Sequence, residues 1–236
     1  MRRRRTEEGA AGPAPEGAER KGPAIRVLFE SDDLLAVDKP EGVVSVSEGG
    51  KGGLPEILRR AGLSAGRLYP AHRLDRGVSG VIVFAKTPEM HRHLNGEFDR
   101  RAVRKTYLAL VHDVIGANRG IVNKLIREFG SGRMGVDPAR GKPSSTEFKV
   151  EDRIEGYTLV RVHPLTGRRH QIRVHLYSLG HPIVGDRRYG GPAVQETFPR
   201  LMLHACEIEF ALPSGERLRI EAPVPDSFTD VVKSLR

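Results

Sequence analysis

One carboxylate between two guanidinium groups is the strongest candidate for a chemically active side chain in this sequence. Asp75 lies between Arg73 and Arg76 in the segment HRLDRGVSG, residues 72–80, and an apolar run of strand length, 81–85, follows at once. A carboxylate beside cations stays ionised, which suits a nucleophile or a general base better than a proton donor. The same pattern is also compatible with a surface ion pair of no chemical consequence.

Three other segments combine basic, aromatic and glycine residues, at 104–111, 165–175 and 180–190. In the first segment, two basic residues precede a predicted strand that carries Tyr107. The second surrounds a glycine turn at the start of a predicted helix with cationic side chains, namely Arg168, Arg169, His170 and Arg173. The third is a long polar loop, and loops of this kind lie on the surface and often carry function. Taken singly, Tyr107 is also compatible with an ordinary strand aromatic, and Arg173 with a solvated helix residue.

Metal and nucleotide cofactors find no support in the sequence. His170 and His175 are five residues apart, a spacing that does not place them on one face of a helix, and no glutamate-bearing partner motif accompanies them. Neither a glycine-rich dinucleotide motif nor a phosphate-loop lysine motif is present. We therefore expect a protein without a metal site and without a cofactor.

The charge of the chain favours a polyanionic partner. The formal net charge is +9 and the isoelectric point is near 10.0, with arginine supplying most of the positive charge. Arginine binds phosphate through a planar fork, so nucleic acid is favoured over a membrane surface. The alternative is a basic surface without a specific partner. No apolar stretch approaches the roughly 20 residues that a membrane helix needs.

Cysteine usage and the N-terminal residues bear on the compartment. Cys206 is the only cysteine, so the chain can form neither an internal disulfide nor a cysteine-based zinc site, which fits a reducing compartment. The arginines at 2–5 have no apolar segment after them, which argues against a secretory signal, and the glutamates within 7–19 argue against a transit peptide. The expected location is the cytoplasm, and nothing in the sequence requires more than a monomer.

Composition and periodicity predict one ordered domain that follows a tail. Residues 1–24 are rich in Arg, Glu, Gly, Ala and Pro and predict a disordered tail, whereas residues 25–236 form the domain. Many predicted strands and few predicted helices, in no regular alternation, indicate an α+β fold around a largely antiparallel sheet.

The individual elements follow from local signals. A helix is predicted to begin at Pro88, with Thr87 as its N-cap, and a second helix is predicted at 171–179. Residues 38–42 predict a turn, and Pro213-Ser214-Gly215 predicts a hairpin. Strands are predicted at 25–29, 34–37, 81–85, 107–111, 146–150, 157–162, 206–212 and 218–222.

Taken together, these segments resemble the RluA-type pseudouridine synthases of the RluA/RsuA superfamily. The resemblance covers about residues 34–226. It keeps the family's order through seven motifs, namely LLAVDKP (34–40), HRLDRGVSG with AKT (72–80 and 85–87), KTYLA (105–109), TGRRHQIRVH (166–175), GD with YG (185–186 and 189–190), LHA (203–205) and APVP (222–225). It implies a catalytic domain that isomerises uridine in RNA to pseudouridine without water, metal or nucleotide.

The resemblance also implies roles for individual residues. In this family the aspartate that matches Asp75 is essential, as a nucleophile or as the base of a glycal-type route, and both routes stay open here. Arg173 is implied to pair with Asp75, and Tyr107 to stack on the base and to assist removal of the C5 proton. Arg73 matches the residue that fills the place of the flipped uridine. On charge alone, and not from the resemblance, Arg76, Arg168 and Arg169 are expected to contact RNA phosphates, and His170 is also expected to contact RNA.

The sequence departs from its relatives in two places. Val78 stands where many relatives have threonine, so a hydroxyl is lost while the turn residues Ser79 and Gly80 are kept. Some relatives carry an N-terminal RNA-binding domain similar to one in a small-subunit ribosomal protein. Only about two dozen low-complexity residues precede the match here, so we expect that domain to be absent.

Two other functions compete with the RNA isomerase. One is an RNA-binding or RNA-chaperone protein with lost or secondary catalysis, which would have no need for an acid such as Asp75 in a basic groove. The other is a nucleosidase or base-excising glycosylase, which would release free base. The expected substrate is a structured RNA, ribosomal or transfer, and the sequence does not choose between them.

Overall fold

One large sheet dominates the computed structural model, which describes residues 25–46 and 53–236. Its strands are β1 (Arg26–Glu30), β2 (Leu34–Lys39), β3 (Tyr69–Pro70), β4 (Ser79–Ala85), β5 (Arg104–His112), β6 (Arg119–Glu128), β7 (Met134–Val136), β8 (Lys142–Ile154), β9 (Tyr157–Pro164), β10 (Leu203–Ala211) and β11 (Arg217–Glu221). The strand order is β1-β2-β4-β10-β5-β9-β8-β6-β7, with β3 added at β4 and β11 at β10. Every pairing is antiparallel except the short contact of β4 with β10. The expected α+β class with a largely antiparallel sheet is confirmed.

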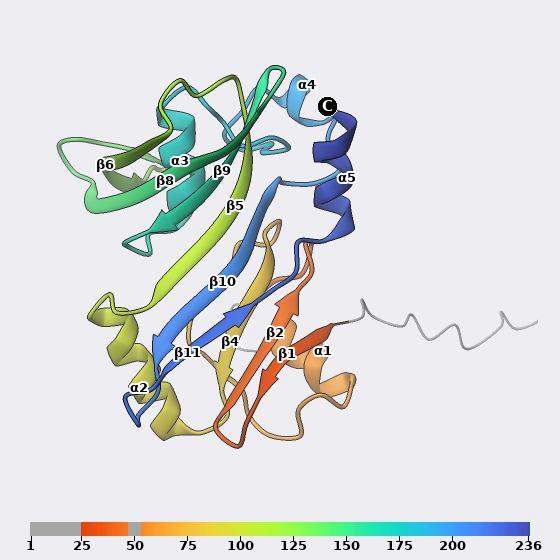
Figure 1. The fold of residues 1–236 in the computed structure, drawn as a ribbon. Helices are drawn as coiled ribbons and strands as arrows, with labels where there is room; N and C mark the ends of the chain where they lie inside the picture. Colours follow the sequence, from red (N-terminus) through yellow and green to blue (C-terminus); the bar gives the residue numbers. More distant parts are fainter. Residues whose placement is uncertain (1–24, 47–52) are drawn as a thin grey trace, which may run out of the picture.

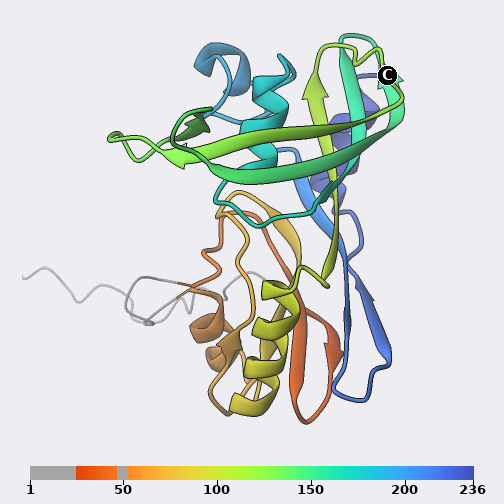
Figure 2. The ribbon, with the colours of Figure 1, turned by 90° about the vertical axis from the view of Figure 1, so that its left-hand side faces the viewer.

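The sheet joins two halves through its two central strands. β5 and β10 run between the halves (Figure 1), and the helices are α1 (Leu54–Arg60), α2 (Pro88–Asp99), α3 (Gln171–Ser178), α4 (Pro192–Gln195) and α5 (Asp226–Ser234). One half contains β1, β2 and β4 with α1 and α2, and the other contains β9, β8 and β6 with α3. Turned by 90°, the two halves stand one above the other (Figure 2). Residues from both halves line a cavity between them.

Both predicted helices are confirmed. Thr87 caps α2 by accepting a hydrogen bond from the Met90 N–H, and Met90 and Leu94 are buried, as the four-residue spacing predicted. The predicted 171–179 helix ends one residue earlier, at Ser178. The hairpin around residues 213–215 is confirmed too, because β10 and β11 pair in antiparallel register from Glu207 to Ala211.

The expected turn at 38–42 is wrong in its first half. Asp38 and Lys39 continue strand β2, and Lys39 is fully buried. Its ammonium donates hydrogen bonds to the carbonyl oxygens of Pro40, Val43 and Arg76, at 2.9, 2.8 and 3.4 Å. These three acceptors allow the core to hold a charged side chain that the sequence pattern assigns to a surface turn. The predicted tail, 1–24, lies outside the described residues.

The core gathers where β2, β4 and β10 lie together. The side chains of 34–37 and 81–85 are all buried. Gly80 has a φ of +116°, and a Cβ built there would lie 2.2 Å from the Ala205 carbonyl oxygen. Only glycine allows β4 to approach β10 this closely, and this contact fixes the strand that follows Asp75. Within the described ranges, no helix is long and apolar enough to cross a membrane.

Two buried histidines predict how stability depends on pH. His175 bonds to the hydroxyls of Ser144 and Thr146 at 2.9 and 2.8 Å, and His204 bonds to Ser79 at 2.9 Å. Burial lowers the pKa of each imidazole to about 4, whereas the unfolded value is near 6.5. Between these values the unfolded chain binds protons that the folded chain excludes. The contribution of these two neutral histidines to the stability of the fold is therefore complete above pH 6.5, and it is lost as the pH falls toward 4.

Replacing one of these two histidines should weaken the dependence of the unfolding free energy on pH. For His204→Gln we expect the slope of the unfolding free energy against pH, between pH 4 and 6.5, to fall by up to about 1.4 kcal/mol per pH unit, which corresponds to one proton. Urea unfolding at a series of pH values measures the slope. Equal slopes for the variant and the wild type would contradict the assignment of a neutral, buried His204.

Candidate active site

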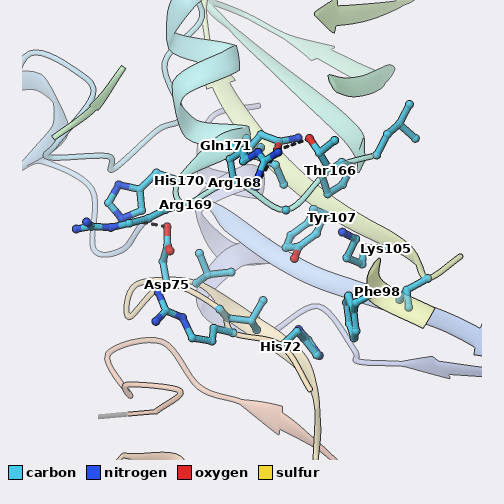
Figure 3. Close-up of a pocket in the computed structure, with 18 of the residues that line it drawn as sticks. His72, Asp75, Phe98, Lys105, Tyr107, Thr166, Arg168, Arg169, His170 and Gln171 are labelled. Carbon is cyan, nitrogen blue, oxygen red and sulfur yellow. Dashed lines mark hydrogen bonds and ion pairs between the residues drawn. The ribbon is translucent and has the colours of Figure 1, made fainter. Parts of the chain in front are cut away.

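A cavity of about 850 Å³ lies where the two halves of the molecule meet. Asp75 enters it from the turn before β4, Tyr107 from β5 and Arg173 from α3, and all three line the cavity. Figure 3 shows the Asp75 carboxylate and the Tyr107 ring directed into this space from different elements. The structure thus brings together the three residues that the resemblance implied for catalysis.

Arg173 is the ion-pair partner of Asp75. Its Nη1 donates to Asp75 Oδ2 at 2.9 Å, across 98 positions of sequence. The Arg173 side chain is 11% exposed and that of Asp75 is 27% exposed, so the pair is shielded while one side of the carboxylate stays accessible. Because the guanidinium is fixed, the direction of the carboxylate is also fixed.

Asp186, on the loop after α3, holds the other side of the same guanidinium. Arg173 Nε and Nη2 donate to its two carboxylate oxygens, each at 2.8 Å, in a fork-to-fork pair. Oδ1 also accepts the backbone N–H groups of Arg188 and Tyr189. Burial alone would lower the pKa of Arg173, but Asp186 and Asp75 outweigh burial and raise it. The sequence placed Asp186 in a polar loop but gave no sign that its side chain is fully buried.

His170 lies beside the Asp75 carboxylate. It precedes α3 with a left-handed backbone, φ 54°, and its Nε2 is 3.7 Å from Asp75 Oδ2. Burial lowers its pKa to about 4, and the neighbouring arginines act in the same direction, while Asp75 opposes them. The ring is therefore neutral near pH 7. Its Nδ1 contacts the Tyr189 hydroxyl at 2.7 Å, and that hydroxyl accepts the Met134 N–H. A neutral ring between these groups is placed to help orient Asp75, and the expected contact of His170 with RNA stays a prediction.

Tyr107 provides an aromatic face within the cavity. Burial raises the pKa of its phenol, and the charges of Asp75 and of the Cys206 thiolate form add to the shift. The hydroxyl therefore keeps its proton at neutral pH. Lys105, on the same strand, also lines the cavity, and burial lowers the pKa of its ammonium.

The predicted RNA-contact arginines fall into two groups. Arg73, Arg168 and Arg169 line the cavity; Arg73 is exposed and Arg169 pairs with Glu128 at 2.7 Å. Arg76 is not among the lining residues, and its Nε donates to the Gly42 carbonyl at 2.9 Å. Arg76 therefore ties two turns together instead of facing the cavity.

A metal has no evident binding position in the part of the chain that the structure describes. No group of three or more His, Cys, Asp or Glu side chains there is arranged to hold an ion. The groups that converge around Asp75 are its partly exposed carboxylate, the Tyr107 ring and several guanidinium groups, which suit an anionic, aromatic substrate.

Comparisons with known proteins agree with this geometry. The family model described as RNA pseudouridylate synthase matches residues 33–178. "Ribosomal large subunit pseudouridine synthase C" of Vibrio vulnificus is 39% identical over 218 residues, covering 89% of this chain and 69% of that protein. The Pasteurella multocida protein of the same name is 40% identical over 223 residues, covering 89% and 68%.

Solved structures show the same fold. Human RNA Pseudouridylate Synthase Domain Containing 1 is 29% identical, with a TM-score of 0.75 over 90% of this chain and 94% of that one. Human RNA Pseudouridylate Synthase Domain Containing 4, at 24% identity and a TM-score of 0.74, supports the fold alone. The chain belongs to the RNA pseudouridylate synthase family. It is an RluA-type synthase, an isomerase that converts uridine in RNA to pseudouridine.

The geometry predicts that Asp186 acts on catalysis through Arg173. Asp186→Asn removes the charge and one acceptor of the fork, so Arg173 should shift toward Asp75 and misplace it. We expect kcat to fall on the order of 100-fold, the scale of a misplacement of about 1 Å, with little change in RNA affinity. Single-turnover release of tritium from RNA containing C5-tritiated uridine measures the rate. Asp137→Asn, which alters a similar Arg127 pair that does not line the cavity, is the control. A rate within threefold of wild type would contradict this role.

Proposed function

We propose that this synthase isomerises uridines of large-subunit ribosomal RNA, with Asp75 as the catalytic carboxylate. The observation that carries the assignment is the Asp75 carboxylate, held by Arg173 and partly exposed in a basic cavity that the Tyr107 ring also lines. The choice of ribosomal RNA rests on the names of the relatives from Vibrio vulnificus and Pasteurella multocida.

The reaction needs an ionised acid at the sugar. The bond between N1 and C1′ breaks, the uracil turns, and a bond between C5 and C1′ forms. The C5 proton leaves to solvent and N1 gains a proton, so the RNA keeps its mass. Asp75 acts at C1′ as a nucleophile or at C2′ as a base, and in both routes the Arg173 contact orients the carboxylate.

Tyr107 and Arg73 are assigned to the handling of the base. The Tyr107 ring offers a face on which the detached uracil can stack while it turns, and its raised pKa keeps the phenol neutral. Unstacking a uridine from its helix costs a few kcal/mol. Arg73 is exposed at the cavity, so its guanidinium can fill the vacated place and offset part of that cost.

Arg168 and Arg169 are assigned to the RNA backbone. Both line the cavity, and the Arg169 side chain is 41% exposed. Because Arg169 is paired with Glu128, an RNA phosphate must displace the Glu128 carboxylate, and exposed ion pairs are weak enough for that exchange. Phosphate contacts of this kind position the strand without reading its sequence.

The substitution Asp75→Asn tests this function. Asparagine is close in size, and Asp186 still pairs with Arg173, so the variant should fold and bind RNA. With a C5-tritiated large-subunit RNA transcript, wild type should release tritium without free uracil or strand cleavage, and Asp75→Asn should release none. Asp152→Asn, at a surface pair with Arg236 outside the cavity, should behave as wild type.

Each competing function has its own outcome in that assay. Free uracil would identify a glycosylase, and RNA binding without tritium release from wild type would identify a binding protein. Wild-type rates in Asp75→Asn would remove Asp75 from the mechanism. A transfer RNA transcript is the comparison substrate, and preferential tritium release from it would overturn the choice of ribosomal RNA.

A further inference from the structure

A second cavity, of about 630 Å³, adjoins the active-site cavity. The two cavities share lining residues, namely Arg101, Val103, Lys105, Pro164, Leu165 and Thr166. Lys105 and Thr166 lie on the side of the active site away from His170 (Figure 3). The second cavity therefore extends the first, in the direction away from the Asp75 and His170 side.

The second cavity contains an acid that the catalytic assignment does not use. Glu147 on β8 lies directly across from His163 on β9, and both line this cavity together with Ser145. Among residues 25–46 and 53–236, no ion pair or hydrogen bond engages the Glu147 carboxylate, whereas the nearby cations Lys149 and Arg161 pair with Glu151 instead. A half-buried carboxylate without a partner is an available acceptor for a ligand that brings N–H donors.

Cations lie on the other side of this cavity. Arg101, Arg104 and Lys105 line it, and Arg101 and Arg104 are exposed. Arg101 has a left-handed backbone, with φ 58°, which is uncommon for a residue other than glycine. Its N–H donates to the Phe98 carbonyl, so the turn after α2 is fixed and presents the arginine at the junction of the two cavities.

We infer that the second cavity binds the nucleotide next to the target uridine in the same RNA strand, and that Glu147 reads its base. This inference rests on the proposed function, because the active-site cavity must hold the flipped uridine. The arginines suit the phosphate that links the two nucleotides, and a cavity of this volume is within the usual range for small ligands. Leu165, which is 45% exposed, offers an apolar surface for the base ring.

The chemistry of Glu147 selects among the bases. A carboxylate accepts hydrogen bonds from amino and imino groups, and guanine presents two such donors, N1–H and N2–H, on one edge. Uracil has one N–H between two carbonyl oxygens, and these oxygens would repel a carboxylate. Sequence-specific recognition of RNA commonly reads the edges of splayed bases in this way. The cavity should therefore favour guanine and disfavour uracil beside the target.

A binding experiment without turnover tests this inference. The protein carries Asp75→Asn, and the probes are a uridine nonamer and the same nonamer with one central guanosine. The guanosine should raise affinity by about tenfold, which is within the range for a good bidentate base contact. Adding Glu147→Gln should reduce that gain to threefold or less, because guanine loses its charged acceptor and uracil no longer meets a repelling charge. Glu155→Gln, in the exposed turn after β8 and outside both cavities, should keep the full gain.

The outcomes separate this inference from the proposed function. Equal gains with and without Glu147→Gln, or no gain in the Asp75→Asn protein, would overturn the assignment of the second cavity. These affinities do not depend on catalysis and therefore test only the role of the second cavity. Tritium release by the wild type tests only the proposed function. A guanosine preference that depends on Glu147, without tritium release, would support the cavity and overturn the function.

Discussion

The site depends on one guanidinium shared between two carboxylates. Arg173 offers three of its N–H groups to these acids, two to the buried Asp186 and one to the partly exposed Asp75. A buried guanidinium is costly unless it is paired, and Asp186 supplies that pairing on its own. The three side chains together keep one net negative charge. Asp75 is therefore oriented by a cation without being fully neutralised, which is the state that a nucleophile or base requires.

The rest of the fold holds this contact in place. Asp75 precedes β4, which Gly80 allows to lie close against β10, and the buried ammonium of Lys39 ties down the turn at Arg76. Arg173 belongs to α3 in the other half of the molecule. Since β5 and β10 pair with each other and join the two halves, the distance between the two residues is set by the sheet (Figure 1).

Features of the fold that depend on neighbours in sequence could be predicted from the sequence. Features that depend on contacts between distant residues could not. The cap at Thr87 and the spacing of the α2 stripe depend on neighbours in sequence, so both were predictable. Strand β6 was missed because charged and polar side chains interrupt its alternation and it is only partly buried. Asp186 and Lys39 were misread because a charged residue in a polar segment suggests solvent, and only partners distant in sequence show that each is buried. Arg76 bonds through its Nε to a backbone carbonyl that only the folded chain brings near, and its contact with RNA stays a prediction.

The most direct test of the shared guanidinium is the rate of Arg173→Lys. Lysine keeps the charge but has a single nitrogen, so it cannot hold both oxygens of Asp186 and still orient Asp75. Single-turnover tritium release should fall by about 100-fold or more, while RNA affinity stays within about threefold of wild type. Arg127→Lys, at the Asp137 pair outside the cavity, should leave both unchanged. A rate for Arg173→Lys within threefold of wild type would show that charge alone suffices, and would contradict the account.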